Sequence, residues 1–160
     1  MPAPEPFNIV GRYFWLLAIA VTTVNAAIWW HRAQANIAAR PELEVGYRRL
    51  IRGLLVYGSI PWLVMGAGIV FGRVDGVFSY FNPKNGPYVV AWYASVVILW
   101  LLSAAWLFFM RGAEQLIEHP GLLNLPSQNP RVVKAFFLLC LAGGLVGLSI
   151  MLFGEAPVAP

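Results

Sequence analysis

The sequence predicts an all-α polytopic membrane protein, a single four-helix transmembrane domain over residues 1–160 with a cytoplasmic helical hairpin between its first two spans. One observation is that four apolar stretches contain no Asp, Glu, Lys, Arg or His: residues 13–30, 53–71, 88–110 and 135–153. Each has roughly the 20 mostly apolar residues that a helix needs to cross the hydrocarbon core. A second observation is that the basic residues gather in two of the connecting segments, which gives these spans a direction.

The first span, residues 13–30, begins and ends with aromatic side chains, which favour the headgroup region. Residues 31–40 contain no helix breaker before Pro41, so we expect the helix to continue beyond the membrane. Pro41 followed by Glu42 and Glu44 is typical of a new helix start, because proline suits the first turn and acidic groups suit the positive end of the helix dipole. This arrangement predicts the helical hairpin that leads into the second span.

The remaining spans are bounded by prolines and glycines. Inside the second span, Pro61 removes one backbone donor and predicts a bend. Residues 82–87 predict a rigid turn before the third span. Residues 110–119 predict a helical continuation of that span, which Pro120 and Gly121 end, and a turn-rich stretch then precedes the fourth span.

Loop charges predict the orientation of the chain. Eight basic residues lie in the two loops that must share a side: Arg32, Arg40, Arg48, Arg49 and Arg52 before the second span, and Arg111, Arg131 and Lys134 before the fourth. The opposite side has only Arg12, Arg73 and Lys84. The positive-inside rule therefore predicts cytoplasmic Arg-rich loops and both termini on the non-cytoplasmic side, in a bacterial inner membrane or a thylakoid. The net charge of +4 is explained in this way, and we expect no nucleic-acid partner.

Small residues recur one helical turn apart, a spacing that lets two helix backbones approach closely in lipid. Three such stripes occur: Gly143 with Gly147 in the fourth span, Gly68 with Gly72 in the second, and Ala18, Thr22 and Ala26 in the first. The spacing does not say whether the contacts join helices of one chain or of neighbouring chains. Both interpretations stay open at this point.

Polar side chains within the spans fall in the cytoplasmic half of the predicted membrane domain. They are Thr22, Asn25, Tyr57, Ser59 and Ser103, with Cys140 at a similar depth. One interpretation is a structural hydrogen-bonded cluster, since an unpaired amide is costly in hydrocarbon. The alternative is a cavity that opens to the cytoplasm.

Two further groups allow both a structural and a binding interpretation. Trp62 and Trp100 lie near the middle of their spans, either as bulky packing residues or as walls of a pocket for a lipid, quinone or pigment. Arg48, Arg49 and Arg52 act first as topology determinants and second as a possible contact for anionic lipid.

Catalytic chemistry finds little support in the sequence. Glu114 and Glu118 stand one helical turn apart, with His119 adjacent and His31 at the corresponding end of the first span, but the spacing matches no metal signature. We expect these charged groups to be exposed and to pair with Arg111 or with solvent. No Walker loop, HExxH motif or serine nucleophile elbow is present, so we expect no catalytic residue and no metal site, and no cofactor is identified.

These observations favour a non-enzymatic integral membrane protein that assembles through its small-residue faces, as a homo-oligomer or as an accessory subunit of a membrane complex. Its other partner is the lipid bilayer. The first alternative is an oligomeric channel or passive transporter whose path uses the polar cytoplasmic half. The second is a binder of lipid, quinone or pigment.

Overall fold

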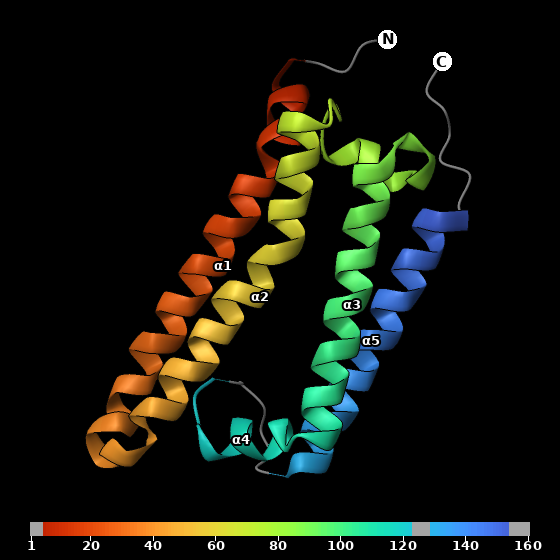
Figure 1. The fold of residues 1–160 in the computed structure, drawn as a ribbon. Helices are drawn as coiled ribbons and strands as arrows, with labels where there is room; N and C mark the ends of the chain where they lie inside the picture. Colours follow the sequence, from red (N-terminus) through yellow and green to blue (C-terminus); the bar gives the residue numbers. More distant parts are fainter. Residues whose placement is uncertain (1–4, 123–128, 154–160) are drawn as a thin grey trace.

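The computed structural model describes residues 5–122 and 129–153, and all regular structure in this part of the chain is helical (Figure 1). Four helices are long and apolar enough to cross a membrane, which confirms the predicted class. They are α1 (Glu5–Ala39), α2 (Glu44–Phe71), α3 (Pro87–Phe109) and α5 (Pro130–Phe153), and a short helix, α4 (Gly112–Glu118), precedes the last. The predicted placement of the two termini concerns residues 1–4 and 154–160, and much of the predicted turn-rich stretch spans 123–128; these lie outside the described residues.

The long helices run alternately up and down (Figure 1). α1 packs along α2, and α2 contacts α3 where the last turns of α2 meet the first turns of α3, while α5 lies beside α3. At one end, called the turn end below, α1 passes into α2 through a one-turn 3-10 helix, Pro41–Leu43, and α4 lies across the end of the molecule (Figure 1). At the other, called the loop end, residues 72–86 connect α2 to α3 through the 3-10 helices Val77–Phe81 and Pro83–Asn85.

Proline marks the start of several of these elements. Pro41, Pro87 and Pro130 each occupy the first position of a helix, where a missing amide proton costs no helical hydrogen bond and the fixed φ suits the helix. Pro61, by contrast, lies inside α2 without ending it. Because its nitrogen carries no proton, the carbonyl four residues earlier loses its usual intrahelical donor.

The predicted helical continuation of the third span is wrong. α3 ends at Phe109, and Arg111 adopts a left-handed backbone conformation with φ of 60° before α4 begins. The break turns α4 away from the axis of α3 and buries Ala113 completely, in a cluster with Leu107 of α3 and Val133 of α5. This packing favours the break, although a left-handed residue other than glycine is intrinsically unfavourable.

The buried core lies mostly at the two ends of the molecule. At the loop end, residues of α2, α3 and the connecting loop form one cluster: Met65, Ile69, Val74, Tyr80, Val89 and Tyr93. At the turn end, a second cluster contains Ala33, Tyr47 and Leu122. In the most apolar 18-residue stretch of each long helix, at most 22% of the residues are buried inside the chain. Their exposed middle sections are therefore surfaces suited to lipid or to other membrane helices.

Residues that follow α4 pack against the turn-end cluster and cover it. The Pro120 carbonyl oxygen accepts hydrogen bonds from the Tyr47 hydroxyl at 2.7 Å and from the Asn36 amide at 3.1 Å. The ring of His119 lies edge-on to that of Tyr47, with centroids 4.8 Å apart, and covers Gly46. His119 is only 7% exposed, so the expectation of an exposed imidazole is wrong. The physical reason is the missing side chain at Gly46, which leaves room for the ring.

Candidate functional site

The glycine pair of α2 is used inside the chain. A Cβ at Gly68 would overlap the Tyr80 hydroxyl, and a Cβ at Gly72 would overlap the ring of Tyr88. The Tyr80 hydroxyl donates to the Met65 carbonyl oxygen at 2.9 Å, and the Tyr93 hydroxyl donates to the Tyr80 carbonyl oxygen at 2.8 Å. Gly68 and Gly72 thus allow the loop-end aromatic residues to approach the backbone of α2.

The small residues of α1 also face the neighbouring helix. Ala26 is 6% exposed and Ala18 is partly buried. The Thr22 methyl group lies 3.1 Å from the position that a Cβ on Gly58 of α2 would occupy. This stripe serves the contact between α1 and α2 within one chain.

The glycine pair of α5 is different. Apart from the adjoining residues and the nearby backbone of α5 itself, no described atom lies within 4 Å of the Cβ position of either Gly143 or Gly147. A Cβ at Gly144, between them, would lie 2.7 Å from the Trp100 ring of α3. One side of α5 therefore packs against α3, and the adjacent side presents Gly143 and Gly147 to open space.

Large apolar side chains flank this glycine pair. Leu139 is 70% exposed, Val146 is 61% exposed and Ile150 is 65% exposed. The only buried residue of α5 is Val133, near its beginning. We call the surface formed by Leu139, Cys140, Gly143, Val146, Gly147 and Ile150 the outer face of α5. It has the composition of a helix-packing surface, with small residues at the centre and bulky ones at the sides.

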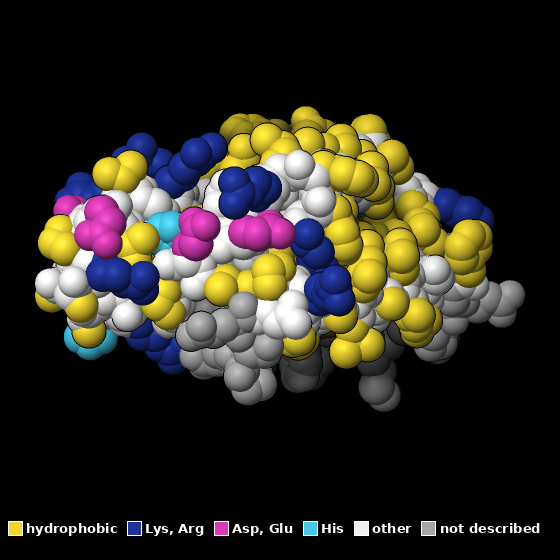
Figure 2. All heavy atoms as spheres, turned by 90° about the horizontal axis from the view of Figure 1, so that it is seen from below, with side chains coloured by type: hydrophobic (Ala, Val, Ile, Leu, Met, Phe, Trp, Pro, Cys, Tyr) yellow, Lys and Arg dark blue, Asp and Glu magenta, His cyan; other side chains and the backbone are white. Residues whose placement is uncertain are grey.

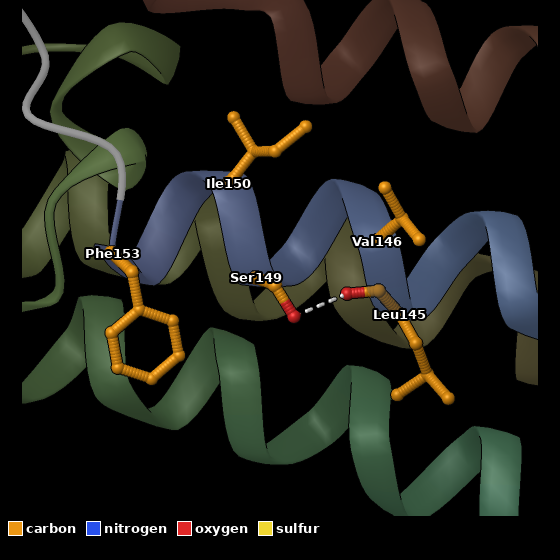
Figure 3. Close-up of a pocket in the computed structure, with 5 residues that line it drawn as sticks. All are labelled: Leu145, Val146, Ser149, Ile150 and Phe153. Atoms are coloured by element: carbon orange, nitrogen blue, oxygen red, sulfur yellow. Dashed lines mark hydrogen bonds between the residues drawn. The ribbon is translucent and has the colours of Figure 1, made fainter.

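A shallow hollow of about 490 Å³ lies on α5 beside this face, lined by Leu145, Val146, Ser149, Ile150 and Phe153 (Figure 3). The Ser149 hydroxyl donates to the Leu145 carbonyl oxygen of its own helix at 2.8 Å. The hollow therefore offers apolar surface and no free hydroxyl proton. Such a surface suits an acyl chain or an apolar side chain of another helix better than a polar ligand.

The polar residues predicted to lie together have separate surroundings. The hydroxyls of Thr22 and Ser59 donate to carbonyl oxygens of their own helices, Ala18 at 2.9 Å and Leu55 at 2.6 Å. Three others are exposed on different helices or faces: Asn25 on α1, Tyr57 on α2 and Ser103 on α3. No hydrogen bond in the described part of the chain joins any two of these five side chains.

The two mid-span tryptophans contact different neighbours. Trp62 of α2 meets Phe14 of α1 edge-to-face, with ring centroids 5.9 Å apart, and Trp100 covers Gly144. Each ring thus fills space between two helices. Trp92 of α3 packs edge-on against Tyr80 and Tyr93, and its indole N–H is buried without an acceptor among the described residues. The sequence alone does not predict this packing of Trp92, because it depends on the loop between α2 and α3 being buried.

The ionisable residues near α4 have structural partners. Glu114 lies 3.4 Å from the Lys134 ammonium of α5. The pKa of Glu114 lies below its ordinary value, chiefly because its own backbone amide donates to the carboxylate and also because of Lys134. Nδ1 of His119 lies 2.7 Å from the Gln115 carbonyl oxygen. Among residues 5–122 and 129–153, no group of three or more His, Cys, Asp or Glu side chains is placed to hold a metal ion.

Comparisons with known proteins give no relative: no protein-family model, no curated protein and no solved structure matches this chain.

Proposed function

We propose that this chain is a non-enzymatic membrane subunit that packs the outer face of α5 against a transmembrane helix of another subunit. The observation that carries the proposal is the open space at Gly143 and Gly147. In lipid, helices associate through close backbone approach at small residues, because lipid tails are as apolar as the side chains themselves. The small residues of α1 and α2 already face partners inside the chain, whereas this pair has none among the described residues.

The position of α5 in the fold supports the same proposal. The helix contacts α3 through one side and α4 near its beginning, and its most apolar window contains no buried residue. A peripheral helix with a glycine-centred outer face suits contact with a second copy of the chain or with a larger membrane complex. Both kinds of assembly fit the surface.

The proposed orientation places the turn end in the cytoplasm. That end combines five arginines with the basic residues around α4 and α5. The five are Arg32 of α1, Arg40 in the turn after α1, and Arg48, Arg49 and Arg52 of α2. The Asn36 and Tyr47 hydrogen bonds to Pro120 hold the two Arg-rich connections together. In this arrangement the α1–α2 turn forms a helical hairpin that extends into the cytoplasm, with the loop end on the opposite side.

The test is the mass and composition of the particle extracted in a mild detergent. A homo-oligomer is expected to give a multiple of the 17.7 kDa chain mass, and an accessory subunit is expected to copurify with other proteins. A particle that contains one chain, with no other protein, would contradict the proposal. Extraction in several mild detergents guards against dissociation by any one of them.

A further inference from the structure

A groove of about 470 Å³ runs along the exposed side of α2 near the turn end. The residues that line it include Arg48, Arg49, Arg52, Gly53, Val56 and Tyr57. Viewed from the turn end, Lys and Arg side chains gather beside acidic ones, and broad hydrophobic surfaces adjoin them (Figure 2). The groove therefore lies where charged and apolar surfaces of the molecule meet.

One of the three arginines is already paired. The Arg48 guanidinium contacts the Glu44 carboxylate at 2.6 Å and lies 5.5 Å from the centre of the Trp30 ring. Arg49 and Arg52 are exposed, and no ion pair in the described part of the chain engages them. Two guanidinium groups, one helical turn apart, therefore face the groove with charge available for an anion.

The rest of the groove is apolar and open. Apart from the adjoining residues and the nearby backbone of α2 itself, no described atom lies within 4 Å of the Cβ position of Gly53, so the wall is hollowed directly beyond Arg52. Val56 and Tyr57 follow one turn further along α2, toward the middle of the span, and are 52% and 58% exposed. A free anion would occupy only the arginine end. A molecule with an anionic head and an apolar tail would cover both parts.

We infer that this groove binds an anionic phospholipid. Its phosphate lies between Arg49 and Arg52, whose planar guanidinium groups can each donate two hydrogen bonds to phosphate oxygens. One acyl chain then runs past Gly53 and along Val56 toward the middle of the bilayer. Arg48, held by Glu44 and Trp30, forms the fixed side of the groove. The inference depends on membrane residence and is independent of assembly through α5.

Native mass spectrometry of the detergent-extracted protein tests the site, with phosphatidylglycerol and phosphatidylcholine of identical acyl chains as probes. Phosphatidylglycerol is expected to stay bound in preference to phosphatidylcholine. The double variant Arg49→Gln/Arg52→Gln is expected to weaken that binding roughly 30-fold, since each interfacial arginine is worth about fivefold. Arg131→Gln, which removes one positive charge from α5 near the turn end, is the control and is expected to leave binding unchanged.

A second variant tests the shape of the groove without altering its charge. Gly53→Leu fills the hollow beyond Arg52 and is expected to reduce phosphatidylglycerol binding, while the open space at Gly53 lets the fold accept the side chain. Inorganic phosphate in excess is expected not to displace the lipid. Equal binding of the two lipids, equal losses in Arg131→Gln and the double variant, or displacement by inorganic phosphate would each overturn the inference.

Discussion

The Tyr47 hydroxyl donates a hydrogen bond to the Pro120 carbonyl oxygen at 2.7 Å, which joins α2 to the segment that follows α4. The Asn36 amide of α1 donates to the same oxygen at 3.1 Å. A single carbonyl group thus connects three parts of the chain that are far apart in sequence. We expect this contact to fix the position of α4 against the turn between α1 and α2.

Removing the Tyr47 hydroxyl should weaken this contact without removing the ring that packs against His119. Tyr47→Phe is expected to lower the stability of the folded protein by about 1 kcal/mol, the usual net value of one hydrogen bond. Thermal unfolding in detergent measures the change. Tyr57→Phe is the matched control, because Tyr57 lies on the same helix with a side chain that is 58% exposed. Equal effects of the two variants would show that the bond to Pro120 contributes nothing.

Two glycines of α2 should respond to alanine with opposite signs. Alanine in a helix is more stable than glycine by roughly 0.5–1 kcal/mol, and Gly53→Ala is expected to gain this amount because its Cβ meets open space. Gly46→Ala is expected to destabilise the protein, because the new Cβ would overlap the His119 ring and displace it. The unfolding temperature of each variant, compared with that of the wild-type protein, measures the two changes in stability. A gain at both positions would mean that His119 does not pack closely on Gly46.

The spans could be predicted from the sequence because apolar runs bounded by Pro41, Pro87 and Pro130 are local signals. The break at Arg111 could not, since it depends on Ala113 packing between α3 and α5. The burial of His119 likewise requires Gly46, which only the fold brings beneath it. Local sequence patterns thus predict the helices and their proline-marked starts. Contacts between distant segments determine the break at Arg111 and the burial of His119.

The candidate site shows the same division. The one-turn spacing of small residues identified Gly68, Gly72, Gly143 and Gly147 equally well. Which pair faces outward depends on Tyr80 and Tyr88, which cover the α2 pair, and on the rotation of α5 that points Gly144 at Trp100. The spacing of the glycines predicts neither the positions of these tyrosines nor the rotation of α5.

The orientation predicts which end of the molecule is accessible from outside the membrane. In a Cys140→Ala background, a membrane-impermeant thiol reagent is expected to label Lys84→Cys at the loop end from the outside of intact cells. Glu42→Cys, in the turn between α1 and α2, is expected to react only after the membrane is opened. Both parent side chains are exposed, so accessibility differs only through topology. The reverse labelling pattern would mean that the chain is inserted the other way round.

Cys140 tests whether the partner of α5 is a second copy. It is the only cysteine of the chain, is exposed, and lies on the outer face one turn before Gly143. Mild oxidation of native membranes with copper phenanthroline and oxygen is expected to join two chains through a disulfide. Gly143→Cys in a Cys140→Ala background is expected to give the same product.

If neither Cys140 nor Gly143→Cys gives a cross-linked dimer, the result would argue against a symmetric contact between two copies of α5. It would favour a different protein as the partner. Cys140→Ser provides the control, since any remaining cross-linked species in that variant cannot arise from this residue.

The native mass of the Gly147→Leu protein in mild detergent shows whether the chain assembles through the outer face of α5. We expect the wild-type particle to be larger than the 17.7 kDa chain and to dissociate in Gly147→Leu, because the leucine prevents close backbone approach. Leu138→Phe, an enlargement at an exposed position on the side of α5 opposite Gly147, is predicted to keep the wild-type mass. A Gly147→Leu particle of unchanged mass and composition would show that the outer face of α5 does not hold the assembly together.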